Sequence, residues 1–399
     1  MDIQSAYGNA AAAGAAQAMM ASAGQQAPAT ALASGGARKY PKWLPKKAKN
    51  DKRRPAARTG EAIQAEIDAA LQEHLGPDTD LAGLSEEQRA RIKVDVVISL
   101  GKGPYVIEHP IRVCSGVVIE GDDTVLRWRG KVTKAEHSVI EGKGVRDVMI
   151  RGVHIKGGTS AADRKETRKE VREKATQDDD PGESHKLKMR QAWADTPRLV
   201  GINLEGRGAK DANKDGVVNK KDDSNFTIAD SEIEGCGKYG IHISGARDVR
   251  LKDNELKRNG TSKAYDHNIY LRRIADVDIE GGSSTKAAGN GLNIARANGV
   301  EIKDFKTSRN GGHGTRIVRG QDIDIDGLTA NRNGEDGLLF GAEPGIMNSS
   351  GKHKQKGAHN KNVSVKHSRM HRNGRKDLHV AEARGERTFE DNDYDTGPR

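Results

Sequence analysis

Short runs of alternating apolar and polar residues recur through the second half of the chain and predict a series of β-strands. The clearest runs are "GIHIS", "NIYLRR", "GLNIA" and "GTRIV", each followed by a turn and a second run of the form Val/Ile-x-Ile/Val. Most units close with Arg-Asn-Gly, and the units follow one another at about 23 residues. Strands with a period of two inside such a repeat predict coils stacked about 4.8 Å apart, with one apolar face turned inward.

An amphipathic helix and further short strands precede these repeats. The segment "TGEAIQAEIDAALQEHLG" places Ile63, Ile67 and Leu71 on one helical face, with Thr59 as N-cap and Gly76 just past the end. The next segment, "PIRVCSGVVIEG", has the β-branched composition of strands. The sequence therefore predicts a parallel β-helix that begins with a helix.

Together, this helix, the first strands and the repeats resemble the right-handed parallel β-helix superfamily of pectate lyases, polygalacturonases, alginate epimerases and phage tailspikes. The resemblance covers roughly residues 59–390. It implies an all-β fold, a right-handed parallel β-helix solenoid in which the helix caps the N-terminal end. The superfamily includes several chemistries and members that only bind, so the fold alone does not determine the activity.

Three polar segments interrupt the coils, at residues 158–197, 206–223 and 342–361. The first contains the predicted helix "ADRKETRKEVREKA", and the other two directly follow the strands "GINLEG" and "GLLFGA". These two inserts are predicted to protrude from the same side. We expect three regions: a flexible Ala/Gly-rich tail with a basic linker over 1–58, the β-helix domain over 59–390, and a C-terminal tail over 391–399.

Four coils with short turns lie between the second and third inserts and predict an exposed row of polar side chains. Alignment of the repeats puts four outward positions in register: His242, Tyr270, Asn293 and Arg316. The alignment puts four more polar residues around this row: Asn268 two residues earlier, Arg272 beside it, and His267 and His313 at its entrance. Four coils span roughly 19 Å, enough for about four sugar units. We expect this row to form the floor of a trough walled by the two inserts.

Charge and composition favour an acidic polysaccharide as the partner. The chain has 67 Lys+Arg against 57 Asp+Glu, a net charge of +10 that favours a polyanion. Aromatic residues make up 4%, which argues against a neutral glucan gripped by stacking. A nucleic-acid partner rests on charge alone and is not expected.

The polar row suggests proton abstraction next to a carboxylate. Cleaving or epimerising a uronate polymer needs a cation at the carboxylate and a base for the C5 proton. We expect Arg316 or Arg272 in the first role and His267 or Tyr270 in the second. The residues expected to bind the substrate are His242, Asn293, His313 and Asn268.

Two other function classes compete with this lyase or C5-epimerase. Gly312-His313-Gly314 resembles an element of the polygalacturonases, but Gly289-Asn290-Gly291 stands where that family's paired aspartates belong. Because glycoside hydrolysis needs such a pair, the hydrolase interpretation loses its acid and base. The second competitor is a non-catalytic polysaccharide-binding or tailspike-like virion protein, favoured by the N-terminal tail.

The second insert contains a motif with the spacing of a calcium loop, "DANKDGVVNKKD". The expected ligands are side-chain oxygens and one carbonyl, from Asp211, Asn213, Asp215, Val217, Asn219 and Asp222. The motif resembles a dockerin-type loop, although strands flank it in place of EF-hand helices. We expect Ca²⁺ in a structural role, with a plain polar loop as the alternative.

The remaining features restrict compartment and assembly only loosely. The Arg-Asn-Gly turns predict a basic stripe or simply solvated turns, and the arginines concerned are Arg258, Arg309, Arg332 and Arg372. Cys114 and Cys236 are far apart, so no disulfide is expected. No apolar run approaches the roughly 18 residues of a membrane span, and the N-terminus lacks the pattern of a secretory signal. We expect a monomer or homotrimer that is cytoplasmic, exported by a non-classical route, or associated with a virion.

Overall fold

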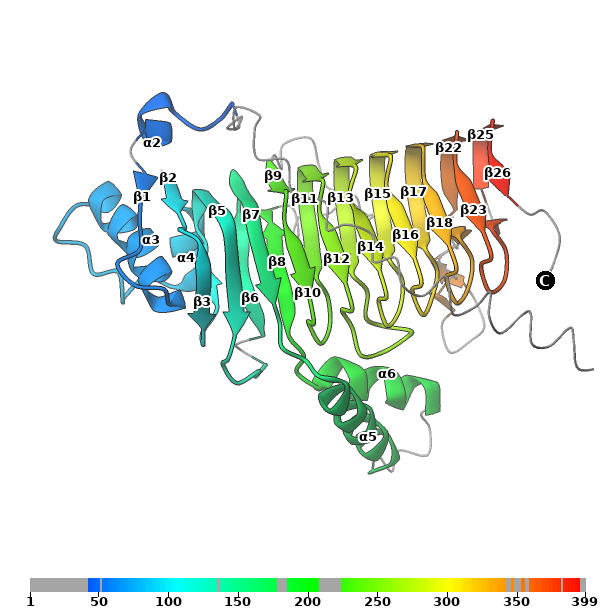
Figure 1. Ribbon diagram of the computed structural model, residues 1–399, viewed down its shortest axis with the longest axis horizontal. Coiled ribbons are helices and arrows are strands. Elements are labelled where there is room, and N and C mark those ends of the chain that lie inside the picture. Colours follow the sequence, from blue (N-terminus) through cyan, green and yellow to red (C-terminus); the bar gives the residue numbers. More distant parts are fainter. Residues whose placement is uncertain are drawn as a thin grey trace, which may run out of the picture. The chain divides into compact units, whose positions relative to one another are not determined.

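The structure, a computed structural model, describes residues 42–50, 52–134, 137–177, 185–207, 224–341, 346–347, 353–355, 359–381 and 383–394. Among these residues, 24 strands form a single sheet system in which every strand pair is parallel, and the coils stack side by side along the solenoid (Figure 1). This confirms the predicted parallel β-helix.

The strands follow the chain in coil order. The N-terminal coils contain β1 (Lys52–Arg53), β2 (Lys93–Ser99), β3 (Gly103–Ile107), β4 (Ile111–Arg112), β5 (Ser115–Trp128), β6 (Ser138–Val145), β7 (Val148–Lys156) and β8 (Val200–Gly206). The central coils contain β9 (Phe226–Ala229), β10 (Glu232–Glu234), β11 (Ile241–Lys252), β12 (Glu255–Lys257), β13 (Ile269–Glu280), β14 (Ser283–Thr285), β15 (Leu292–Lys303), β16 (Lys306–Ser308), β17 (Thr315–Asp326) and β18 (Thr329–Asn331). The last coils contain β19 (Leu338–Gly341), β22 (Asn360–Lys366), β23 (Arg369–His371), β24 (Leu378–Val380), β25 (Ala383–Glu390) and β26 (Asp393–Tyr394). A separate antiparallel pair consists of β20 (Ile346–Met347) and β21 (His353–Gln355).

The apolar positions of the repeat form the core. In the central coils the inward side chains stack in columns, one of which contains Ile243, Leu271, Ile294 and Ile317, all fully buried. Such columns bury aliphatic surface continuously along the solenoid, and each Å² of apolar area removed from water stabilises the fold by roughly 25 cal/mol. The outward positions between them are therefore held in register by the core.

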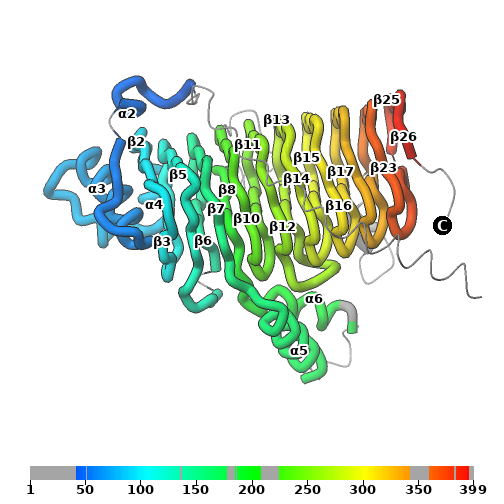
Figure 2. Tube along the Cα trace, in the orientation of Figure 1, coloured from blue at the N-terminus to red at the C-terminus, as the bar shows by residue number. Residues whose placement is uncertain are grey.

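The helices lie at one end and along one edge of the solenoid (Figures 1 and 2). They are α2 (Lys46–Asn50), α3 (Gly60–Leu75), α4 (Glu86–Arg91), α5 (Ala161–Gln177) and α6 (His185–Asp195). The α3 helix begins as predicted, because the Thr59 side chain accepts a hydrogen bond from the Ala62 amide at 3.2 Å. Its apolar face, with Ile63 and Ile67, is buried in the main core. This helix is the predicted N-terminal cap.

Part of the basic segment that precedes α3 packs on the solenoid. Leu44 is 2% exposed and lies against Val97, Val118 and Met149, on the outer side of the sheet. The short strand β1 adds to β2 in parallel register. The segment predicted as a linker therefore includes a folded layer from at least Leu44 onward.

The Arg-Asn-Gly turns adopt a positive φ at the arginine and bury the asparagine. The residue with positive φ is the one before the asparagine, with values of 56° at Arg309 and 55° at Arg332. The asparagines instead turn their side chains inward: the Asn310 amide donates to Asn333 Oδ1 at 3.0 Å and its Oδ1 accepts from the Ala287 amide at 2.9 Å. These buried amides link consecutive coils because they satisfy backbone groups that the turn leaves unpaired.

The α5 and α6 helices form a hairpin against the turns of the central coils. Val171 and Ala175 of α5 pack on Ala192 and Trp193 of α6, and Tyr265 borders the same cluster. Trp193 and Tyr265 lie with ring centroids 6.3 Å apart. The first insert is therefore anchored to the coil that carries the "YDHNIYLRR" stretch.

Two further expectations concern cysteines and membrane spans. Cys114 and Cys236 are both buried and free, and burial raises the pKa of each thiol to about 12, so both are unreactive thiols at neutral pH. Within the described part of the chain, the helices are all too short or too polar to cross a lipid bilayer.

Candidate functional site

The four outward residues predicted to align do lie in register on adjacent coils. His242 on β11 pairs with Tyr270 on β13, Tyr270 with Asn293 on β15, and Asn293 with Arg316 on β17. We call these four residues the outward ladder. The row continues toward the N-terminal end with Asn203 on β8, which pairs with His242. Toward the C-terminal end Arg316 pairs with Leu339 on β19, so the polar part of the row ends there.

An aromatic cluster occupies the N-terminal half of the ladder. The Tyr270 ring lies with its centroid 5.4 Å from His242, 5.6 Å from His267 and 5.3 Å from Tyr239. Tyr239 is 9% exposed, and burial raises the pKa of its phenol, so it stays protonated. The alignment of the repeats did not indicate Tyr239 as a site residue, although Tyr239 stands directly before Gly240, where the repeat begins. The four rings are mostly tilted or edge-on to one another, and His242 and Tyr270 are the two that are half-buried and can offer a partly polar aromatic contact to a sugar.

His242 has a defined tautomer. Its Nδ1 lies 2.8 Å from Asn203 Oδ1, an acceptor, so Nδ1 carries the hydrogen and Nε2 keeps its lone pair. Burial, followed by the nearby charges of Lys238 and Arg272, lowers the pKa of His242 to about 3. The imidazole is therefore neutral at pH 7 and is a weak base with one free nitrogen.

His267 and His313 are buried rather than exposed at the entrance of the row. They are 5% and 8% exposed, and each Nδ1 accepts a hydrogen bond of 3.1 Å from a backbone amide of the next coil, that of Asn290 and Asp336 respectively. In the neutral ring the hydrogen then resides on Nε2. His313 directs Nε2 at Glu335, 2.9 Å away.

This geometry changes the role that His267 can have. Burial lowers its pKa to about 3, with smaller effects from Arg316 and His313. Because the basic nitrogen is already occupied by the Asn290 amide, the expected role of His267 as proton acceptor does not fit. Its Nε2–H is a hydrogen-bond donor beside Tyr270.

Asn268 does not face the ladder surface. It is fully buried, and its amide nitrogen donates to Ser284 Oγ at 2.9 Å and to Thr285 O at 3.0 Å. Its Oδ1 accepts from the Asn259 amide group at 3.0 Å. Since all these partners belong to the protein, Asn268 serves the coil and leaves no group for a ligand.

The cationic end of the ladder is Arg316. Its Nη1 donates to Asn293 Oδ1 at 3.2 Å, and Asn293 is itself held by Asn290 through a bond of 3.2 Å. Among the described residues, no carboxylate lies within 4.0 Å of the Arg316 guanidinium. Burial lowers its pKa, yet an arginine stays charged at neutral pH. Arg272 is exposed beside the ladder, so a second cation is available two residues from Tyr270.

Two aspartates near the ladder are poorly placed for hydrolysis. Asp266 is fully buried, accepts hydrogen bonds from the Thr261 and Ser262 amides, and lies 3.4 Å from the buried Arg198. Burial raises the pKa of Asp266, an effect that Arg198 opposes. Asp336 is 1% exposed. Neither of these two carboxylates is available to flank a scissile bond.

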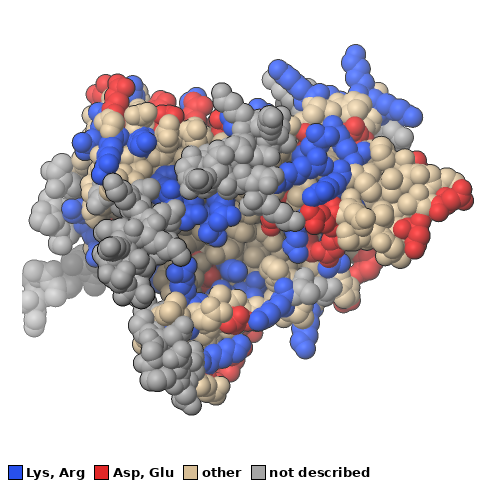
Figure 3. Space-filling view, turned by 180° about the vertical axis from the view of Figure 1, so that it is seen from behind, with Lys and Arg blue, Asp and Glu red and all other residues tan. Residues whose placement is uncertain are grey.

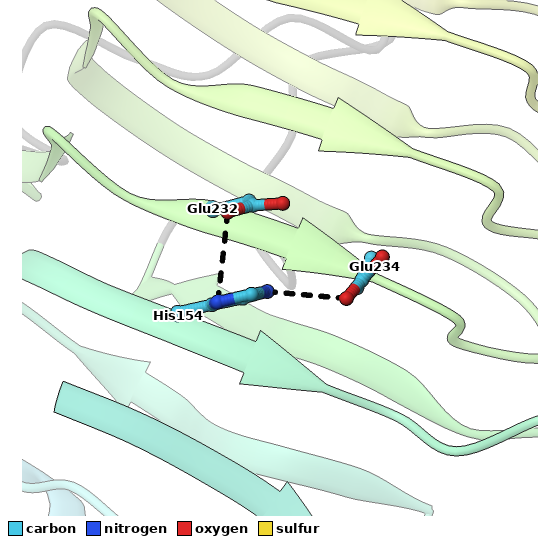
Figure 4. Close-up of side chains that lie close together, drawn as sticks. All are labelled: His154, Glu232 and Glu234. Atoms are coloured by element: carbon cyan, nitrogen blue, oxygen red, sulfur yellow. Dashed lines mark ion pairs between the residues drawn. The ribbon is translucent and has the colours of Figure 1, made fainter. Parts of the chain in front are cut away.

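A His/Glu cluster lies on a different face of the coils (Figure 4). His154 on β7 directs Nδ1 toward Glu232 at 3.5 Å and Nε2 toward Glu234 at 3.3 Å, and the three ligand atoms lie within 4.8 Å of one another. Lys257 and Arg258 pair with the same two carboxylates. Since these cations already compensate the negative charge, the cluster is a mixed ion-pair network rather than a cation site.

Positive charge gathers on the face shown in Figure 3. Seen from behind, Lys and Arg side chains crowd the middle of the surface around a hollow (Figure 3). Three half-buried arginines stand at equivalent positions on adjacent coils, a few residues after the ladder residue of each coil: Arg273, Arg296 and Arg319.

The expected calcium loop, Asp211 to Asp222, lies outside the described residues.

The family comparison agrees with the coil geometry. Residues 215–394 match the family described as "Right handed beta helix region". The described coils form a right-handed parallel β-helix. This confirms the fold that the resemblance implied, and the matched residues include the coils that carry the outward ladder.

Solved structures similar to this chain come from several sources. A Geobacillus virus E2 protein, ORF18, is 10% identical with a TM-score of 0.48 and is matched over 84% of this chain and 59% of its own, so this chain spans less than two thirds of its length. The Streptococcus pneumoniae surface protein and adhesin PfbA is 11% identical, with coverage of 84% and 92% and a TM-score of 0.47. The A-module of the Azotobacter vinelandii mannuronan C-5 epimerase AlgE4 is 12% identical, with coverage of 84% and 90% and a TM-score of 0.37. A search of the curated proteins found no match. At these identities and TM-scores the solved structures carry no argument about the activity of this chain.

Proposed function

We propose that the protein binds an acidic, uronate-containing polysaccharide along the outward ladder and removes the C5 proton of one bound sugar. The observation that carries the proposal is the in-register row that places aromatic rings and the Arg316 cation on neighbouring coils, with no carboxylate of the described residues within 4.0 Å of that cation. A polymer bound along this row would place successive sugars over successive coils, since coils repeat at about 4.8 Å.

The proposed chemistry assigns one role to each end of the ladder. Arg316 would neutralise the sugar carboxylate, which stabilises the negative charge that develops when the adjacent C5–H bond breaks. The oxygen of Tyr270, after giving up its own proton to solvent, would take the C5 proton. Tyr270 replaces His267 in this role because the His267 Nδ1 is already bonded to the Asn290 amide.

Two reactions follow from the same carbanion. In a lyase the C4–O bond breaks, its electron pair leaves with the oxygen, which takes up a proton, and a C4=C5 double bond remains. In an epimerase a proton returns to C5 from the opposite face and no bond of the chain is broken. The His267 Nε2–H beside the ladder and the Nε2 of His242 within it are the polar groups that could transfer a proton in either step.

The test uses the purified full chain with alginate, polygalacturonate and glycosaminoglycans. A rise in absorbance of the unsaturated uronate would identify a lyase. Exchange of the C5 hydrogen with deuterated water, without that absorbance, would identify an epimerase. If neither signal appears and binding is still detected, the alternative holds: a polysaccharide-binding β-helix without catalysis, as in an adhesin or a virion component. No binding to any of these polymers would contradict the proposal as a whole.

A further inference from the structure

We propose that the edge where each coil turns toward the ladder carries a second binding surface, which holds a linear acidic polysaccharide against the short strands β14, β16, β18 and β23. We call four residues on this edge the basic edge: Lys286, Arg309, Arg332 and Arg372. None of them belongs to the outward ladder, so this surface goes beyond the proposed function.

The four cations stand in strict register. Each cation directly follows the last residue of a short strand. These last residues pair across adjacent coils: Thr285 with Ser308, Ser308 with Asn331, and Asn331 with His371. Backbone hydrogen bonds extend the register through the corner itself: the Lys286 amide donates to Ser308 O and the Arg309 amide to Asn331 O. One cation therefore occurs on every coil, at the strand spacing of about 4.8 Å.

These cations occupy a backbone conformation that disfavours long side chains. Their φ angles are 54°, 56°, 55° and 58°, and all four side chains are exposed. A residue other than glycine, asparagine or aspartate in this region costs roughly 1 kcal/mol. At the preceding corner, three of these coils have residues that relieve this cost, Gly281, Asp304 and Gly327, and the fourth has His367, all at positive φ. The basic edge thus keeps cations where folding alone favours smaller residues.

The strip of strands beside this edge is polar and free of negative charge. Its outward residues are Ser283, Thr285, Lys306, Ser308, Thr329, Asn331, Arg369 and His371. Carboxylates stand on the strand next to each end of the strip: Glu255 on β12 pairs with Ser283, and Asp393 on β26 pairs with Arg369 and lies 3.1 Å from His371. For the four cations of the edge, the described residues contain no carboxylate within 4.0 Å.

The side chains of this strip favour a polysaccharide over a nucleic acid. Single-stranded nucleic acids are held by aromatic side chains on which the bases stack, and these strand positions contain no Phe, Tyr or Trp. Hydroxyl and amide groups in rows suit the hydroxyls of sugars. An arginine matches a carboxylate with two parallel hydrogen bonds, and one cation per coil suits a polymer with one carboxylate per sugar.

The test removes the charge without disturbing the corner. In the triple variant Lys286→Asn, Arg309→Asn, Arg332→Asn the new residues accept a positive φ readily. Both this variant and its parent also carry Tyr270→Phe and Arg316→Gln, so that the ladder contributes little to binding. Calorimetry at low ionic strength measures the affinity for polygalacturonate and alginate, and for single-stranded DNA of similar length.

We expect the triple variant to bind the uronate polymers about tenfold more weakly, since three exposed ion pairs are lost. Two controls accompany it: Lys286→Arg, Arg309→Lys, Arg332→Lys, which keeps the charge, and Lys102→Gln, Arg250→Gln, Lys361→Gln, which removes three exposed cations elsewhere. Both are expected to bind as the parent does. An unchanged affinity in the triple variant, or an equal loss in the second control, would overturn the proposal. The proposal would also be overturned if the parent bound DNA but neither polysaccharide, or if it bound none of the three polymers.

Discussion

Arg316 and Asn293 lie opposite each other on adjacent strands, and the guanidinium donates a 3.2 Å hydrogen bond to Asn293 Oδ1. Asn293 is 4% exposed and its oxygen also accepts from Asn290, so the acceptor is held from two sides. This fixes one nitrogen of the guanidinium and leaves the others for a ligand. Arg316 is thus a positioned cation.

The first prediction concerns this cation. Arg316→Gln is expected to lower kcat/KM on a uronate polymer by a factor of about 100 or more, because a lost oxyanion donor typically costs 2.7–4 kcal/mol. The melting temperature should hardly change, because the side chain is half-buried and makes one hydrogen bond. The measurement is initial rate by double-bond absorbance or C5 exchange. Arg250→Gln, an exposed arginine on β11, is the matched control, and equal turnover in both variants would remove Arg316 from the mechanism.

Most of the coil geometry follows from the sequence because it depends on two periodicities. The inward columns alternate with outward residues at a period of two, and the coil repeat places His242, Tyr270, Asn293 and Arg316 in one row. A shift of one residue would have turned the Ile and Leu columns into solvent, so the register is strongly determined. The row was therefore predictable residue by residue.

The turns were less predictable, because there the side chains choose between solvent and the backbone of the next coil. The sequence pattern predicts exposed polar side chains at His267 and Asn268. Both are buried instead and form hydrogen bonds with groups of the following coil or turn. The repeat contains no signal that separates these two outcomes. Whether such a side chain is buried depends on which backbone groups at the corner lack a hydrogen-bond partner. That in turn depends on the three-dimensional path of the next turn.

A second prediction is that the fold loses stability as the pH falls below about 6.5, partly through His267. Its pKa is lowered to about 3 in the folded chain, against roughly 6.5 when unfolded. The unfolded state therefore binds a proton first, and stability present above pH 6.5 is lost as the pH falls toward 3. The expected slope is on the order of 1 kcal/mol per pH unit for this residue. Urea unfolding at pH 7 and pH 5.5 measures it.

The variant that tests this assignment is His267→Asn, whose side-chain oxygen can still accept from the Asn290 amide. Its stability should vary less between the two pH values than that of the parent. His371→Asn is the control, because His371 lies 3.1 Å from exposed Asp393 at the surface. If His267→Asn keeps the full pH dependence, another group is responsible.

A third prediction concerns the buried asparagines that link the coils. Asn310→Ala removes the acceptor of the Ala287 amide and the donor to Asn333, two buried groups. Each unsatisfied group costs about 1–3 kcal/mol, so the free energy of unfolding is expected to fall by about 2–5 kcal/mol. Asn298→Ala, at a half-buried strand position, should change it by much less. Chemical denaturation of the two variants decides, and equal losses would contradict the role of the turn amides.

The last prediction concerns the loop from Asp211 to Asp222, for which the sequence alone provides the argument. If the loop binds Ca²⁺ in the folded chain only, the ion adds about 2.7 kcal/mol of stability at 100 times its dissociation constant. The melting temperature should therefore rise with added Ca²⁺ and fall with a chelator. Mg²⁺ should act weakly, because it keeps its own water and demands a tighter octahedral site.

Two variants separate this loop from other cation sites. Asp211→Asn with Asp215→Asn removes two charged ligands and should abolish the shift. Lys214→Gln should instead strengthen binding, because a neighbouring positive charge repels the ion. Turnover is measured alongside with and without chelator, since an ion that only stiffens the insert changes the melting temperature more than kcat. A melting temperature that ignores Ca²⁺ would show that the motif is a plain polar loop.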